Sequence, residues 1–286
     1  MDLIASLTIN GLATGMLIFL LAAGLTLIFG LMSVLNFAHG GLFIWGAYTG
    51  VWIYSMSESF FLAIITAIIT GLVLGLITER LIIRPVYGNH IQQILITLGF
   101  MIVLQELIKV VFGPDIKAVN APAWLAGNFQ VGEITLIKYR LFIIAVGLLV
   151  FFTIYLILKK TRIGLIVRAG VMNREMVQTL GINIRFVFMA VFMVGAALAA
   201  LSGILHAPYS GSIYAEMGLE FSILAFIVVV IGGMGSFTGS LFAALLVGLA
   251  QAYMAYYFPA LSLAVNMLIM VVVLVFRPQG LFKVKG

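Results

Sequence analysis

The sequence lacks cysteine, and charged residues make up only 8% of its 286 positions. Without cysteine the chain has no disulfide bonds, thiolate metal sites or cysteine nucleophiles. The small number of charges excludes a water-soluble domain, because a soluble surface needs about a quarter of its residues charged. Hydrophobic residues make up 64% of the chain, and the mean hydropathy is +1.27. This composition predicts a polytopic protein of the lipid bilayer.

Motifs for catalysis are also lacking. The sequence contains no GxxxxGK[ST] phosphate loop, no HExxH and no GxSxG. Its three histidines, His39, His90 and His206, are dispersed, and none has an acidic neighbour at a spacing typical of metal ligands. We therefore predict a non-catalytic transport protein with no cofactor and no metal. Membrane topology accounts for the net charge of +6, so no nucleic-acid partner is expected.

Long apolar stretches follow one another along the chain. A helix that crosses a hydrocarbon core of about 30 Å needs about 20 apolar residues. We read nine spans, with eight or ten as alternatives: Leu3–Phe29, Phe37–Met56, Phe60–Ile82, Ile91–Phe112, Leu136–Leu158, Phe186–Ala207, Leu219–Ile231, Phe237–Phe258 and Ala260–Phe276. The first is long, the seventh is short and both are rich in glycine, so one of the two is a candidate for a broken or re-entrant helix. The prediction is an all-α fold in a single transmembrane domain over residues 1–286.

Positive charge is distributed unequally over the two sides that nine spans define. Eleven of the fifteen Lys and Arg residues then share the side of the C-terminus. Because cytoplasmic loops carry the excess of cations, this distribution predicts a cytoplasmic C-terminus and an N-terminus outside. Residues 113–135 then form an external loop, for which contact with an extracellular partner and a plain linker are both open.

The longest polar stretch lies between Lys159 and Arg185 and carries six of the fifteen cations. We expect a helix over Val167–Leu180 within it, closed by Gly181 as the C-cap glycine. A basic helix in an otherwise apolar chain is typical of a cytoplasmic docking element. Alternatively, its charges serve only as topology signals.

One carboxylate, Glu106, lies well within a predicted span. It is one helical turn from Lys109, so an ion pair near the headgroups is expected. Ion-coupled carriers usually keep ionisable residues near the middle of the membrane. A secondary ion-coupled carrier is therefore the less favoured class, and a structural membrane subunit is a further alternative.

Five separated motifs follow one another in the sequence: Gly24–Gly40, Glu79–Pro85, Gly164–Asn183, Ile231–Ser236 and Arg277–Leu281. Together they resemble the LivH-type permeases of the bacterial branched-chain amino acid ABC importers, from about Gly11 to Leu281. The resemblance implies a permease domain in the bacterial inner membrane. It also implies ATPase-driven alternating access for branched-chain or related amino acids, with urea, short amides and aromatic acids as alternative substrates.

The resemblance implies partners as well. These are a LivM-like second permease, two cytoplasmic LivG/LivF-like ATPase subunits and a periplasmic substrate-binding protein. Whether the chain pairs with a distinct permease or with itself stays open. Residues 159–185 then form the coupling segment, whose candidate contacts to the ATPase are Arg168, Asn173, Arg174, Glu175 and Gly181.

The candidates for the transport pathway lie at two junctions between spans. Asn36, Phe37 and His39 lie between the first two spans, and Gly233 and Ser236 lie in a glycine-rich turn between two later ones. Polar residues there are suited either to line the pathway or to cap a helix. For the glycine turn, tight helix packing is a sufficient alternative.

Overall fold

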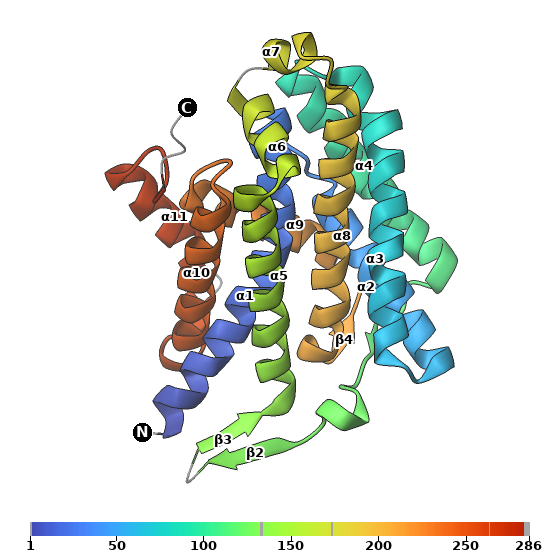
Figure 1. Ribbon diagram of the computed structural model, residues 1–286. Helices are drawn as coiled ribbons and strands as arrows, with labels where there is room; N and C mark the ends of the chain where they lie inside the picture. The colour runs from blue at the N-terminus through green and yellow to red at the C-terminus, as the bar shows by residue number, and fades with distance from the viewer. Residues whose placement is uncertain (1, 132–133, 173, 263, 283–286) are drawn as a thin grey trace.

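The protein is a helical bundle with short strands at one end, described by a computed structural model over residues 2–131, 134–172, 174–262 and 264–282 (Figure 1). Within these ranges the α-helices are α1 (Asp2–Met32), α2 (His39–Ser57), α3 (Phe60–Ile77), α4 (His90–Phe112), α5 (Lys138–Lys160), α6 (Arg162–Met172), α7 (Arg174–Thr179), α8 (Ile184–Ser210), α9 (Met217–Gly232), α10 (Phe237–Tyr257) and α11 (Val265–Phe276). The predicted all-α class of a polytopic membrane protein is confirmed.

Six helices in the described part of the chain are long and apolar enough to cross a membrane. They are α1, α3 with the turns that extend it to Val86, α4, α5, α8 and α10. The apolar helices α9 and α11 are shorter. Each of the nine predicted spans coincides with a helix, and the number of crossings stays a prediction.

α1 is the central helix of the bundle and packs against α5, α8, α9 and α10. Small residues permit this close packing. A Cβ atom on Gly24 of α1 would collide with the backbone oxygen of Gly195 of α8. A Cβ atom on Gly40 of α2 would in the same way collide with the backbone oxygen of Gly218 of α9. Side chains at these points would force the helices apart.

The irregular backbone does not lie where the sequence suggested. Neither α1 nor α9 is broken, and the glycines of α1 serve helix packing instead. The helix ends beyond Met32, where Ser33 takes a left-handed φ of +53°, and residues 33–38 then run to α2 without helical structure. A second irregularity is a π-helical turn at the end of α3, Thr78–Ile83, followed by a 3₁₀ turn, Arg84–Val86.

The strands lie at the lower end of the bundle in Figure 1, and α6 and α7 lie at the upper end. β1 (Lys117–Ala118) pairs antiparallel with β4 (Ser212–Ile213). β2 (Asn128–Val131) pairs antiparallel with β3 (Ile134–Ile137), with Asn128 opposite Ile137. The predicted loop over residues 113–135 is therefore tied to the segment between α8 and α9.

Candidate functional site

Residues 33–38 connect α1 to α2, and side chains of other helices form hydrogen bonds with the backbone of Phe37. The Phe37 N–H group donates to Thr97 Oγ1 of α4 at 3.2 Å. Ser222 Oγ of α9 donates to the Phe37 carbonyl oxygen at 2.6 Å. A buried backbone outside a helix needs such partners, because an unpaired amide within a membrane protein costs several kcal/mol.

Asn36 lies three residues before α2 and is only 2% exposed. Its Oδ1 atom accepts a hydrogen bond from the Ala38 N–H group at 3.1 Å, and its carbonyl oxygen accepts one from the His39 N–H group at 3.3 Å. The N-cap of α2 is Ala38 and no side chain in the described part of the chain caps this helix, so the bond to Asn36 Oδ1 is an Asx turn that leads into α2 and not the expected helix cap. Asn36 Nδ2 has no hydrogen-bond partner among the described residues.

A narrow pocket adjoins this segment, between the inner surfaces of α1 and α9. It is lined by Leu25, Phe29, Leu35, Asn36, Phe37, Ser222, Phe226, Val229 and Met234. Its open volume of about 10 Å³ has room for about one water molecule. The rings of Phe37 and Phe226 lie 5.6 Å apart across it. The pocket is thus a narrow, almost entirely apolar space, and one of its lining side chains carries an amide nitrogen without a partner among the described residues.

The other pathway candidates lie outside this pocket. His39 is fully buried, and its Nε2 atom lies 3.0 Å from the Leu21 carbonyl oxygen of α1. Ser236 is the N-cap of α10, because its Oγ atom accepts from the Gly239 N–H group at 3.1 Å. Gly233 has a φ of +99° and packs against the backbone of Phe282. All three contribute to the packing and capping of the bundle.

The coupling segment, residues 159–185, contains two helices where one was expected. α6 begins at Arg162, five residues before the predicted start, because Thr161 caps it: Thr161 Oγ1 accepts from the Gly164 N–H group at 3.2 Å. The Arg168 side chain is exposed on α6. Asn173 lies outside the described residues, as do the side chains of Arg174 and Glu175 in α7.

α7 ends at Thr179, one residue before the predicted end, and Gly181 closes it as the sequence predicted. This residue has a φ of +78°, and its N–H group donates to the Gln178 carbonyl oxygen at 2.9 Å. The Ile182 N–H group donates to the Val177 carbonyl oxygen at 3.4 Å. These two bonds form the Schellman motif that closes a helix with a left-handed glycine.

The two helices are anchored to the bundle by one face. Val167 and Val177 are buried, and Gly170 lies close to side chains of Leu31 in α1 and Ile184 in α8. The same segment also carries exposed apolar side chains: Ile163, Leu165, Met176 and Leu180. Exposed apolar side chains therefore accompany the exposed Arg168 at this end of the bundle.

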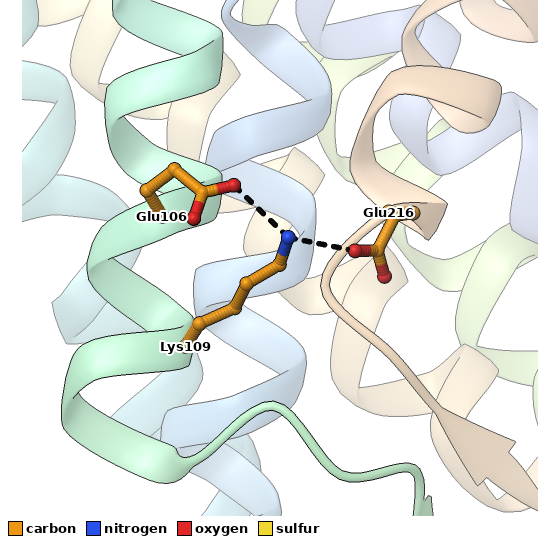
Figure 2. A network of polar contacts seen from close by, with 3 residues as sticks. All are labelled: Glu106, Lys109 and Glu216. Carbon is orange, nitrogen blue, oxygen red and sulfur yellow. Dashed lines mark hydrogen bonds and ion pairs between the residues drawn. The ribbon is translucent and has the colours of Figure 1, made fainter.

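At the opposite end, three charged side chains join α4 to the start of α9 (Figure 2). Lys109 Nζ lies 2.9 Å from Glu106 Oε1, which confirms the predicted pair, and 2.8 Å from Glu216 Oε1. The hydrogen bond from Lys109 lowers the pKa of the Glu216 carboxyl from its ordinary value. Glu106 therefore takes part in a structural ion pair, and Glu216 is an additional member that the sequence did not reveal.

The comparisons with known proteins agree with the arrangement of the helices. A family model described as "Branched-chain amino acid transport system / permease component" matches residues 7–276. The chain belongs to this family. Among its relatives in the permease family, the high-affinity branched-chain amino acid transport system permease protein BraD of Pseudomonas aeruginosa is 32% identical over 96% of this chain and 94% of its own. The corresponding LivH protein of Escherichia coli K12 is 27% identical over 95% of this chain and 93% of its own.

The similarity to one solved structure supports the fold of this permease and nothing of its function. The structure titled "PsaBC from Streptococcus pneumoniae in complex with Fab" aligns with a TM-score of 0.50 and 16% identity. The alignment covers 92% of this chain and 87% of that one. The fold is therefore similar to that of this solved structure despite the low identity.

Two motifs of this permease are explained by contacts within the chain. Glu79 is buried at the end of α3, where the Tyr87 hydroxyl donates to its Oε1 atom at 2.5 Å. The Arg277–Leu281 motif leads into a short backbone pairing with the end of α9: Leu281 N–H donates to the Ile231 carbonyl oxygen at 2.8 Å. Both motifs thus stabilise one end of the bundle.

Sequence reasoning missed Thr97 and Ser222, which fix the Phe37 backbone. Each is a single hydroxyl residue in an apolar helix, which is common in membrane proteins and predicts no particular partner. The signal that was present is the polar Asn36 between apolar residues at a span junction. A polar break of this kind needs partners from neighbouring helices.

Proposed function

We propose that this chain is the permease subunit of a binding-protein-dependent ABC importer for branched-chain amino acids in the bacterial inner membrane. The observation that carries the proposal is the family match over residues 7–276, because it spans nearly the whole transmembrane bundle. Relatives that align over almost their full length have names that give branched-chain amino acid transport as their function. ATP hydrolysis is assigned to separate subunits, so the permease itself is not catalytic.

Alternating access is the mechanism that suits the pocket beside Asn36. Its small open volume corresponds to a closed path, and a substrate larger than water enters only if α1, α9 and residues 33–37 separate. The backbone there is bonded to side chains of α4 and α9, so a movement of these helices carries the segment with it. Interactions elsewhere on the protein must drive this separation of the helices.

The coupling segment, residues 159–185, is the proposed contact with the ATPase subunits. It combines cations with exposed apolar side chains, a composition suited to a protein interface. Its anchored face contacts Leu31 and Ile184, so a displacement of α6 is transmitted to α1 and α8. The further partners are a second permease, LivM-like or a second copy, and a periplasmic binding protein.

The proposed orientation places this segment in the cytoplasm and the strands outside. A cysteine introduced as Arg168→Cys tests it, because the chain has no other thiol and Arg168 is exposed. A membrane-impermeant thiol reagent should label it in inside-out vesicles and not in intact cells. Labelling of intact cells would reverse the topology.

Transport is tested by reconstituting the complete complex in liposomes. Leucine delivered by the loaded binding protein should accumulate only with ATP in the ATPase compartment. Accumulation of urea, a short amide or an aromatic acid in place of leucine would reassign the substrate within the same role. Accumulation by this chain alone, driven by an ion gradient, would make it a secondary carrier.

Coupling is tested by replacing Arg174 and Glu175 together with alanine. We expect ATP hydrolysis to continue while leucine uptake falls about tenfold or more, because the ATPase no longer moves the permease. Replacement of Lys117 with alanine is the control, since Lys117 lies in β1, outside the coupling segment, and its ammonium lies 5.7 Å from the ring centre of Phe112. A fully coupled double variant would contradict the assignment of these two residues.

A further inference from the structure

We propose that Asn36 binds the carboxylate of the transported amino acid through the free hydrogens of its side-chain amide, within the pocket between α1, α9 and residues 33–37. This inference rests on the proposed function and specifies one polar contact along its pathway. The contact is made in a state of the transport cycle in which the pocket is open.

The orientation of the Asn36 amide follows from its neighbour. The Ala38 N–H group is buried at the start of α2 and needs an acceptor, which Asn36 Oδ1 supplies at 3.1 Å. The amide nitrogen therefore occupies the second terminal position of the Asn36 side chain, which lines the pocket. Nδ2 is buried and has no partner among the described residues, so its two hydrogens are available to a ligand.

The only other polar side chain of the pocket is Ser222, and its hydroxyl hydrogen is already used. It donates to the Phe37 carbonyl oxygen at 2.6 Å. Among the polar side-chain atoms that line the pocket, the unused donors are thus those of Asn36, and a buried donor without an acceptor costs about 1–3 kcal/mol. A ligand that offers a carboxylate satisfies this donor, whereas a ligand that offers an ammonium group does not.

The rest of the lining is suited to the aliphatic part of the same ligand. Leu25, Leu35 and Val229 present hydrocarbon, and the rings of Phe37 and Phe226 face each other at 5.6 Å. One donor site in an apolar pocket matches an amino acid with a branched aliphatic side chain. It also gives a weak contact, because a single neutral amide replaces only part of the hydration of the carboxylate.

The variant Asn36→Asp isolates the amide hydrogens. Aspartate has nearly the same shape and keeps an oxygen for the Ala38 N–H group, so the start of α2 is preserved. It removes both Nδ2 donors and places an acceptor opposite the carboxylate of the substrate. In the reconstituted complex we expect ATP-driven leucine uptake to fall at least about tenfold, while the affinity of the binding protein for leucine is unchanged.

Asn266→Asp is the matched control. Asn266 also lies in an apolar helix, α11, and its buried amide oxygen has no partner among the described residues. It does not line the pocket. We expect uptake by this variant to stay within twofold of the wild-type rate. Wild-type uptake by Asn36→Asp would overturn the inference. Failure of the unmodified complex to import leucine would instead reject the proposed function.

A second measurement decides the question if Asn36→Asp does not assemble. Ser222→Cys places the only thiol of the chain in the pocket next to Asn36. During ATP turnover, leucine-loaded binding protein should slow its labelling by a small thiol reagent severalfold relative to empty binding protein. Equal labelling rates would show that leucine does not occupy this pocket and would overturn the inference.

Discussion

Lys109 Nζ lies 2.8 Å from Glu216 Oε1, and this ion pair connects the end of α4 to the residue that precedes α9 (Figure 2). Lys109 also pairs with Glu106 in its own helix, so its one positive charge is shared by two carboxylates. α4 and α9 are also the helices that provide Thr97 and Ser222, the two hydroxyl groups that fix Phe37. The ion pair therefore joins the two helices whose hydroxyl groups bond the backbone of Phe37.

The first prediction is that Glu216→Gln changes stability little. Its side chain is 53% exposed, and exposed ion pairs contribute less than about 1 kcal/mol because water and salt screen them. Lys109 also keeps Glu106 as a partner. Melting of the purified protein in detergent should show a small decrease at low salt that disappears at high salt. A large decrease that salt does not reduce would indicate a structural role beyond this ion pair.

Acid should weaken the same connection. The hydrogen bond from Lys109 lowers the pKa of the Glu216 carboxyl in the folded protein. The stabilisation is therefore complete above the pKa of an unfolded glutamate, about 4.3, and is lost as the pH falls through the lower folded value. The difference in melting temperature between the wild type and Glu216→Gln should be constant at neutral pH and vanish below that range. A difference that persists in acid would exclude this carboxylate as its source.

Glu106→Gln distinguishes an ion pair from an ion-coupling site. Lys109 retains Glu216, so we expect leucine uptake by the complete complex to stay within about twofold of wild type. The measurement is initial uptake with saturating ATP and binding protein. Abolished uptake with unchanged ATP hydrolysis would revive the secondary carrier, because such a carrier needs a titratable group in the membrane.

The sequence predicted local features well because they depend on near neighbours. Apolar length predicted a helix at each of the nine positions, the spacing of Glu106 and Lys109 predicted their pair, and Gly181 predicted the end of α7. The missed contacts join distant segments. Phe37 contacts Thr97 and Ser222, which are 60 and 185 residues away in the sequence. The local sequence does not indicate which hydroxyl group in an apolar helix will contact Phe37.

The position of the non-helical segment between α1 and α2 also could not be predicted from local sequence. Glycine in α1 suggested a break within the helix, because glycine is unfavourable in helices exposed to water. In the folded bundle Gly24 instead lies against Gly195, and the close packing of α1 on α8 outweighs the local preference. The break follows after Met32, where neighbouring helices supply partners for the backbone.

Gly40→Ala should destabilise the protein through helix packing. Its added methyl group would collide with the backbone oxygen of Gly218, so α2 and α9 must separate, at a cost of about 1–3 kcal/mol. Gly99→Ala is the control, because Gly99 lies in helix α4 with no other atom near the added methyl group. Melting in detergent should show a clear loss for Gly40→Ala and no loss for Gly99→Ala, since alanine favours helices. Equal melting of the two variants would contradict the close contact of α2 and α9.

Gly233→Ala should release the C-terminal segment from the end of α9. Gly233 has a φ of +99°, and an added Cβ atom would also collide with the carbonyl oxygen of Phe282. The hydrogen bond from the Phe282 N–H group to the Gly232 carbonyl oxygen, 3.2 Å long, would then be lost. Chymotrypsin should cleave after Phe282 several times faster than in the wild type, measured by loss of a C-terminal tag.

Gly88→Ala provides the control for backbone strain, because Gly88 has a φ of +87° and no atom of the described residues near the added Cβ. Both variants are compared at the same temperature below melting, and if only Gly233→Ala accelerates cleavage, the collision and not the backbone strain releases the segment. Equal cleavage in both variants would exclude the contact with Phe282 as the cause.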